Sequence, residues 1–274
     1  RDTMTIMGYP WYELFLFFFF YSFLGWLMET CYCSIHEHKL VPRGFLYGPI
    51  CPIYGCGVLL MILFFTPLKR NLVLFYVTAV VVMTSWEYFV GWLLETTTHV
   101  KYWDYSHSKF NIKGRVCLWV ALTWGLLSYA VIFWIHPPVE SLYTHIPLWL
   151  VNTLCGVLGA VLAADAVITI RELALMSKMV TAMTKAKEEL QLQLSLGKAE
   201  LTDKLDNSGE ELKKRYREQM ARLERYTRRY RRRYSGMRFS ERYPISMEDI
   251  RAAGALAREE LLRRRDARRA QKKH

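Results

Sequence analysis

Five long apolar runs constrain most strongly what this chain can fold into. A bilayer core of about 30 Å requires about 20 helical residues, and a helix satisfies its backbone hydrogen bonds internally. The first run, WYELFLFFFFYSFLGWLMETCYC, is too long and too aromatic for a signal peptide. The sequence therefore predicts an all-α integral membrane protein with five transmembrane helices. The runs lie at about residues 11–33, 49–65, 72–97, 116–135 and 147–170.

Charge divides the chain near Arg171. The whole sequence holds 37 Lys/Arg and 25 Asp/Glu, of which residues 171–274 hold 28 and 16. The remaining 9 and 9 leave residues 1–170 neutral, so the net charge of +12 belongs to the tail. We predict a transmembrane domain over 1–170 and a cytoplasmic, helical, basic tail over 171–274.

Basic residues in the short loops set the expected orientation, because cytoplasmic loops are enriched in Lys and Arg. The loop after the first run carries Lys39 and Arg43, and the loop after the third carries four such residues. On the other side, one loop carries Lys69 and Arg70, and the 136–147 loop carries none. We expect a multi-pass protein of the cell membrane with its N-terminus outside and its tail in the cytoplasm.

A six-residue motif occurs twice, as GWLMET at 25–30 and as GWLLET at 91–96. Each copy ends an apolar run and precedes a basic loop, a glycine beside a cation and a cysteine. Two spans per copy give the copies one orientation, which predicts a parallel two-span repeat. The repeat units are about 11–66 and 72–135, and the fifth helix, at about 147–170, follows them. Glu29 and Glu95 are equivalent positions in this repeat.

The entry to the second span contains several prolines and glycines between 44 and 57. Irregular backbone at membrane depth is tolerated against protein or water. One alternative is a re-entrant or cavity-lining segment, and the other is a loop followed by a helix that begins near Cys56.

Three carboxylates are candidates for a substrate, ion or proton site. Glu29, Glu87 and Glu95 each lie on a helix face with small residues, and an intramembrane carboxylate normally faces a bundle interior or water. Glu87 is about two turns deeper than Glu95 and is the stronger candidate. The alternative for Glu29 and Glu95 is an interfacial carboxylate that pairs with Lys or Arg of a loop. Asp165 is expected at the interface.

The six cysteines lie in or beside apolar runs, so we interpret them as small buried residues rather than a disulfide framework. Cys31, Cys33, His36 and His38 have a spacing that permits a metal but matches no zinc motif. We therefore predict no metal site and no cofactor. No nucleophile–base arrangement, metal signature or cofactor loop is strong enough to predict an enzyme, so the sequence leans against one and leaves the question open.

Several motifs occur in order along the transmembrane domain: FLGWLMETCYCSI (23–35), RGFLYGPICPIYG (43–55), EYFVGWLLE (87–95) and WDYSHSKFNIKGRVCLWVALTWG (103–125). With these motifs the chain resembles the ABC-transporter type IV, CmpB-like permease family over about residues 13–170. Pro42 departs from the pattern, which is expected to have Asn there. The matching positions are Gly25, Glu29, Arg43, Gly44, Gly48, Pro49, Pro52, Tyr54, Gly55, Glu87, Glu95, Trp103, Asp104, Tyr105, Asn111, Gly114 and Trp124.

The resemblance implies a permease-like protein whose partners include membrane lipids. The sequence has no G-x-x-x-x-G-K-[ST] phosphate loop, so the ATPase of an ABC permease would be a separate chain. Five spans are few for a complete permease, and we therefore expect a homo-oligomer. Candidate ligand-binding residues in the loops and at the spans are Arg43, Tyr54, Trp103, Asp104, Asn111 and Arg115.

The loop residues have two interpretations. Asp104 is expected to pair with Arg43 or Arg115 at the cytoplasmic face, and the polar cluster could hold a lipid headgroup or a small anion. In the other interpretation the cluster only locks the loops together.

The tail is predicted to continue the fifth span as an amphipathic, coiled-coil-like helix. Ser208 and Glu211 read as a capping box that opens a second helix, and a last helix follows Ser246. The arginine-rich stretch is a solvated helix face, a binding site for anionic lipid or, least favoured, an RNA-binding segment; nucleic acid is not an expected partner. The lipid-binding candidates are Arg228, Arg229, Arg231, Arg232 and Arg233.

The leading functional hypothesis is a transport-related, permease-like protein with an acidic site at the cytoplasmic ends of the repeated helices. The second is a scaffold or regulator whose tail oligomerises or recruits a partner. The third is a lipid-active membrane enzyme that uses Glu29, Glu95, Asp104 and histidines.

Overall fold

The computed structural model describes residues 5–197, 218–224, 227–234, 237–239, 248 and 263. The chain divides into two compact units. Unit 1 comprises Arg1–Leu93 and Trp103–Ile170, and unit 2 comprises Leu94–Tyr102 and Arg171–His274. The capping box at Ser208 and the last tail helix predicted from the sequence lie outside the described residues.

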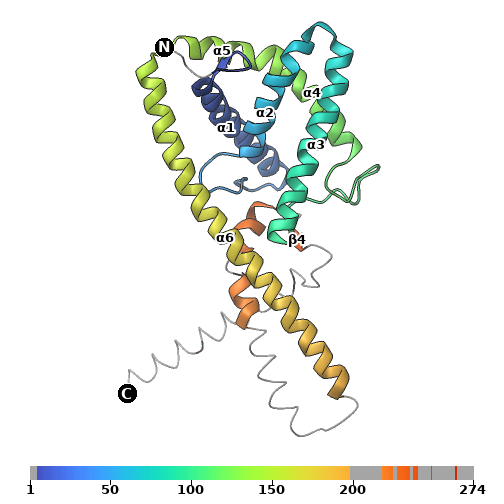
Figure 1. Ribbon diagram of the computed structural model, residues 1–274. Helices are drawn as coiled ribbons and strands as arrows, with labels where there is room; N and C mark the ends of the chain where they lie inside the picture. The colour runs from blue at the N-terminus through green and yellow to red at the C-terminus, as the bar shows by residue number, and fades with distance from the viewer. Residues whose placement is uncertain are drawn as a thin grey trace. The chain divides into compact units, whose positions relative to one another are not determined.

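The described residues are mostly helical (Figure 1). Five helical segments are long and apolar enough to cross a membrane, as the sequence predicted. Four strands of two residues are the exceptions to the all-α expectation: β1 (Thr5–Ile6) pairs with β2 (Tyr9–Pro10), and β3 (Val100–Lys101) with β4 (Arg238–Phe239). The spanning segments are α1 (Trp11–His36), α2 (Pro52–Phe65) with the 3₁₀ turn η1 (Thr66–Arg70), α3 (Leu72–Thr98), α4 (Leu118–Tyr129) with its continuation, and α6 (Leu148–Gly197).

The second span begins as a helix at Pro52, and the loop before it returns to the middle of α1, where the Cys51 N–H donates to the Ser22 carbonyl at 2.9 Å. The re-entrant or cavity-lining alternative stays a prediction. Residues up to Cys51 form a loop, Cys51 is extended, and Pro52 is the first residue of α2. Proline suits this position because its missing N–H would be unpaired there in any case. The plain-helix alternative placed the start of the helix near Cys56, and α2 begins four residues earlier, at Pro52.

The fourth span is longer than predicted. The sequence placed its end at about residue 135, but a π-helical segment, η2 (Ala130–Ile135), leads into α5 (His136–Thr144), which begins His136-Pro137-Pro138. Both prolines lie in the first turn of α5, where they break the fewest hydrogen bonds. Figure 1 shows α5 turned away from the direction of α4.

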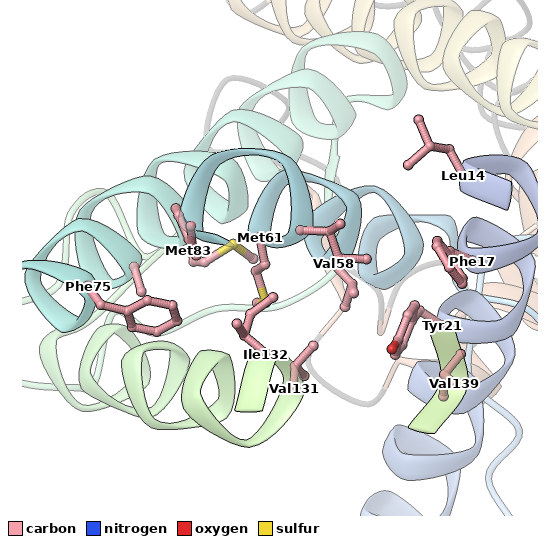
Figure 2. Packing of buried hydrophobic residues seen from close by; sticks show 13 residues of the cluster. Leu14, Phe17, Tyr21, Val58, Met61, Phe75, Met83, Val131, Ile132 and Val139 are labelled. Carbon is pink, nitrogen blue, oxygen red and sulfur yellow. The ribbon is translucent and has the colours of Figure 1, made fainter. Parts of the chain in front are cut away.

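The core of unit 1 is a cluster of aromatic and aliphatic side chains from α1, α2, α3, η2 and α5, shown in Figure 2. Phe17, Phe65, Phe75 and Ile132 are completely buried in it. Many large apolar side chains on the outside of the same helices are exposed, and in a membrane such faces contact lipid.

Helix α6 runs without a break from Leu148 to Gly197, so the predicted helical continuation of the fifth span is correct as far as the described residues extend. Within unit 2, Val100 of β3 pairs with Phe239 of β4. The ring of Tyr102 lies against those of Tyr230 and Tyr234. Unit 2 therefore combines the segment after α3 with residues of the tail.

Candidate functional site

Two polar loops, residues 37–51 and 103–117, lie at the same end of unit 1 (Figure 1). The β1–β2 hairpin, η1 and α5 lie at the other end. Several of the predicted site residues meet near this end. They come from the last turns of α1, the first turn of α2 and the second half of α3.

An ion pair joins the first loop to α1. Arg43 Nε lies 3.2 Å from Glu29 Oε1, with both side chains largely buried. The backbone N–H of Arg43 donates to Thr30 Oγ1 at 3.2 Å, and its carbonyl accepts from Trp26 Nε1 at 3.0 Å. Helix α1 thus fixes both the backbone and the side chain of Arg43. The Tyr54 hydroxyl also hydrogen-bonds the Glu29 carboxylate.

Two glycines allow this arrangement. The Tyr54 ring lies directly on Gly25, so a Cβ at that position would overlap the ring. Gly55 lies against the Phe18 carbonyl and the Ser22 hydroxyl, and a Cβ there would overlap both. Small residues of this kind let two membrane helices approach closely. Helices α1 and α2 therefore approach at Gly25 and Gly55, and this approach sets the position of Tyr54.

Glu87 lies on α3 with only 6% of its surface exposed. Its Oε2 accepts a hydrogen bond from Trp124 Nε1 of α4 at 3.0 Å, and its Oε1 accepts one from the Tyr105 hydroxyl at 3.4 Å. Within the part of the chain that the structure describes, no Lys, Arg or His side chain pairs with it. The Trp124 and Tyr54 ring centroids are 6.0 Å apart. Glu29 and Glu87 are therefore linked through Tyr54 and Trp124.

Tyr105 connects the second loop to this network. Its backbone N–H donates to the Gly114 carbonyl at 2.8 Å, which holds the loop closed. Burial, together with the negative charge of Glu87, raises the pKa of the Tyr105 hydroxyl above its usual value of 10.0. The charge of Glu29 acts in the same direction. Tyr105 therefore remains a hydrogen-bond donor at neutral pH.

The other predicted residues of the second loop bond mainly within it. Asp104 Oδ1 accepts from the Ser106 N–H and hydroxyl at 3.1 and 2.6 Å. Asn111 donates to the Ser108 carbonyl at 2.9 Å and accepts from the Gly114 N–H at 3.1 Å. Trp103 Nε1 donates to the Arg115 carbonyl at 2.9 Å. These contacts fit the interpretation in which the residues lock the loop.

The pairing of Asp104 with Arg43 or Arg115 stays a prediction. Arg43 has Glu29 as an acidic partner. Arg115 Nη1 donates to the Tyr88 hydroxyl at 2.8 Å, and its guanidinium lies over the Tyr88 ring.

Glu95 belongs to unit 2, whereas Glu29 and Glu87 belong to unit 1. Its Oε1 lies 4.0 Å from Lys101 Nζ, and both side chains are nearly buried. This ion pair with a loop lysine is the structural alternative that the sequence left open for Glu95.

Sequence reasoning placed Trp124 and Tyr105 in the family motifs but not among the site residues. A signal was available, because the polar hydrogen of a buried Trp or Tyr needs an acceptor. Asp165 was expected at the interface. Its Oδ1 and Oδ2 accept hydrogen bonds from the backbone N–H groups of Tyr47 and Gly48 at 2.8 and 2.7 Å.

Three arginines of the arginine-rich stretch of unit 2 form ion pairs with acidic side chains. Arg228 forms two hydrogen bonds to Glu224, at 3.1 and 2.9 Å. Arg231 lies 3.5 Å from the same carboxylate, and Arg229 lies 2.8 Å from Glu172. Arg232 is exposed. Lipid binding by Arg228, Arg229, Arg231, Arg232 and Arg233 stays a prediction, now weighted toward Arg232.

The described residues contain no group of three or more His, Cys, Asp or Glu side chains that could hold a metal ion. Where Glu29 and Glu87 meet, the side chains on hand are these two carboxylates, the Arg43 guanidinium and the polar aromatic groups of Tyr54, Tyr105 and Trp124.

Five apolar helical spans with apolar outer faces define a multi-pass α-helical membrane protein. A family model, Putative ABC-transporter type IV, matches residues 16–170. The chain therefore belongs to this ABC-transporter-like family, and it is a transport-related membrane protein. No curated protein and no solved structure matches the chain.

Proposed function

We propose that this chain is a permease-like subunit whose ligand site is the polar cluster at the loop end of unit 1. The cluster is defined by Glu29, Arg43, Tyr54, Glu87, Tyr105 and Trp124, and we call it the loop-end cluster. Its residues come from α1, α2, α3, α4 and both loops, so a ligand bound there would contact every span of the predicted repeat.

The observation that carries the proposal is the environment of Glu87. A buried carboxylate normally has a cationic partner, because desolvation of a lone charge is unfavourable. Glu87 has two neutral donors in that place. With Glu87 ionised, the cluster carries one net negative charge, because Glu29 and Arg43 offset each other. Three aromatic side chains surround it, and aromatic faces attract organic cations. The substrate that fits is therefore a small organic cation.

Orientation and partners follow as parts of the same proposal. The excess of Lys and Arg in the two loops and the tail supports a cytoplasmic location for the loop-end cluster. Membership of an ABC-transporter-like family supports a separate ATPase chain as a partner.

The test is cation binding to the full chain in lipid nanodiscs. Choline serves as the probe, and tryptophan fluorescence reports binding beside Trp124. We expect choline to quench the fluorescence saturably. Glu87→Gln should lower the choline affinity by about ten-fold, equivalent to about 1.4 kcal/mol. The matched control is Glu37→Gln, which neutralises a carboxylate at the same end of α1 that pairs with Lys39. Equal choline affinity in the Glu87 and Glu37 variants would overturn the proposal.

A scaffold role is the second candidate, and the β3–β4 pairing favours it, because it brings tail residues onto the segment after α3 within unit 2. Deletion of residues 171–274 would strip Tyr102 of its ring partners as well as removing the tail. A cleaner test replaces exposed Arg232 and retains the packing. If the scaffold role is correct, this variant loses a bound partner in pull-down while its choline affinity is unchanged.

A further inference from the structure

A second polar cluster lies at the end of unit 1 away from the two loops. His136, the first residue of α5, has only 1% of its surface exposed. Its Nδ1 is hydrogen-bonded to the Tyr21 hydroxyl at 3.1 Å. Its Nε2 lies 4.0 Å from Glu140 Oε2, at ion-pair distance but beyond hydrogen-bond distance. The loop-end cluster uses none of these three residues.

Aromatic rings also pack around His136. The Phe17 ring meets the imidazole edge to face, with centroids 4.9 Å apart. Tyr21, beside Phe17 in Figure 2, is part of the same buried core. A histidine that served only as packing would need no carboxylate at its second nitrogen, and here Glu140 stands one helical turn away on the same helix.

Both ring nitrogens of His136 face an oxygen atom, whether the ring is neutral or protonated. In the neutral ring with its proton on Nδ1, the Nδ1–H donates to the Tyr21 oxygen, and the Nε2 lone pair faces Glu140. When a proton moves from a Glu140 carboxyl oxygen to Nε2, the ring becomes an imidazolium and Glu140 a carboxylate. The two N–H groups then face the Tyr21 oxygen and the Glu140 carboxylate. No change of side-chain rotamer is required.

Glu140 connects the buried ring to the outside. Its side chain is 43% exposed, so Glu140 is the group of this cluster through which protons would be exchanged. The Tyr9 hydroxyl hydrogen-bonds Glu140, and burial, followed by the charge of Glu140, raises the pKa of Tyr9. Tyr9 therefore stays protonated and orients Glu140. The titratable groups that face this cluster are Tyr9 of β2, Glu13 and Tyr21 of α1, Lys69 of η1, and Glu140 and Tyr143 of α5.

We propose that His136 is a proton-binding site, loaded and unloaded through Glu140 from the side of the membrane opposite to the loop-end cluster. The ligand is the proton itself, and the site gives the protein a means of coupling a proton to its transport cycle. The site stands on its own contacts and does not depend on the identity of the ligand at Glu87.

The experiment uses the full chain in nanodiscs with ¹⁵N-labelled histidine. The difference between the wild-type and His136→Gln spectra isolates one ring among the seven histidines. We expect its ¹⁵N resonances to titrate between about pH 5 and about pH 8, the range of histidine ionisation. The matched control, His145→Gln, replaces an exposed histidine just after α5 and leaves that titration in place.

Glu140→Gln keeps His136 and so remains informative even if His136→Gln folds poorly. Loss of the facing carboxylate should weaken proton binding at His136 by about three-fold or more, because an opposite charge nearby favours the charged form. A His136 ring with resonances that do not move across this range, or that titrate identically in Glu140→Gln, overturns the proposal. Choline binding at the loop-end cluster is measured separately, so the two proposals fail independently.

Discussion

At the scale of single residues, the two carboxylates of the loop-end cluster differ in their partners. Glu29 faces a guanidinium, and Glu87 faces an indole N–H and a phenol. The carboxylates themselves were predicted from the sequence, because charged residues in apolar runs are rare. Their partners were not. Tyr105 and Trp124 lie 18 and 37 positions from Glu87, and only the fold brings them together.

Removal of Arg43 should destabilise unit 1. Arg43→Ala leaves Glu29 as a largely buried carboxylate without its cation, which we expect to lower the free energy of unfolding by about 2 kcal/mol. The control variant, Lys39→Ala, breaks the pair between Lys39 and Glu37, in which the lysine is 67% exposed. It should change the free energy of unfolding by less than about 0.5 kcal/mol. Unfolding followed by circular dichroism in detergent measures both. Equal stability of the two variants would contradict the ion pair's role.

The raised pKa of Tyr105 predicts a loss of stability in alkali. Above pH 10.0 the unfolded chain releases the phenol proton while the folded chain keeps it. The unfolded state is then favoured, so the stability present below this pH falls as the pH rises. Tyr105→Phe lowers stability at neutral pH through the lost hydrogen bond to Glu87, but it should lose less stability between about pH 9 and about pH 11 than the wild type. The exposed Tyr32→Phe is the control. Parallel alkaline losses in the wild type and Tyr105→Phe would refute this account.

At the scale of secondary-structure elements, length and hydropathy predicted most of the spans. The first and third runs, at 11–33 and 72–97, became α1 and α3 with ends that differ by at most three residues. Helix α5 was missed because consecutive prolines normally end a helix. The π-helical segment before it and the packing of Val139 in the core of unit 1 are tertiary features, and local sequence does not encode them.

The close approach of α1 and α2 predicts a specific sensitivity to a single methyl group. Gly55→Ala places a Cβ onto the Phe18 carbonyl and the Ser22 hydroxyl, so the helices must separate. We expect a loss of about 1–3 kcal/mol, as for other overpacked sites, and a weaker hold on Tyr54. Gly156→Ala on α6 meets no atom within 4 Å and is the matched control, which should leave stability unchanged or slightly higher. Thermal unfolding in detergent distinguishes them, and equal melting temperatures would argue against the packing described.

At the scale of the whole molecule, the chain combines a neutral set of membrane spans with a basic tail. The sequence placed the domain boundary at 170/171, and the second compact unit also contains Leu94–Tyr102. That segment could not be assigned from composition, because its partners, such as Phe239, lie far along the chain. The parallel repeat, the coiled coil and the homo-oligomer stay predictions.

The predicted orientation can be checked with single cysteines in a cysteine-free background. A membrane-impermeant maleimide should label Lys69→Cys in intact cells, because the turn between α2 and α3 is predicted to lie outside. Lys109→Cys, in the second loop, should react only after the cells are permeabilised, because cytoplasmic loops carry the positive charge. The opposite labelling pattern would invert the topology and would place the loop-end cluster outside the cell.

If the loop-end cluster binds an organic cation through the charge of Glu87, it must distinguish choline from dimethylbutanol, the neutral isostere in which carbon replaces the quaternary nitrogen. Isothermal titration of the full chain in nanodiscs measures both affinities. We expect the wild type to bind choline about ten-fold or more tightly than dimethylbutanol, and we expect Glu87→Gln to abolish the preference. Equal affinity for the two compounds, or a preference that survives in Glu87→Gln, would contradict binding through the charge of Glu87.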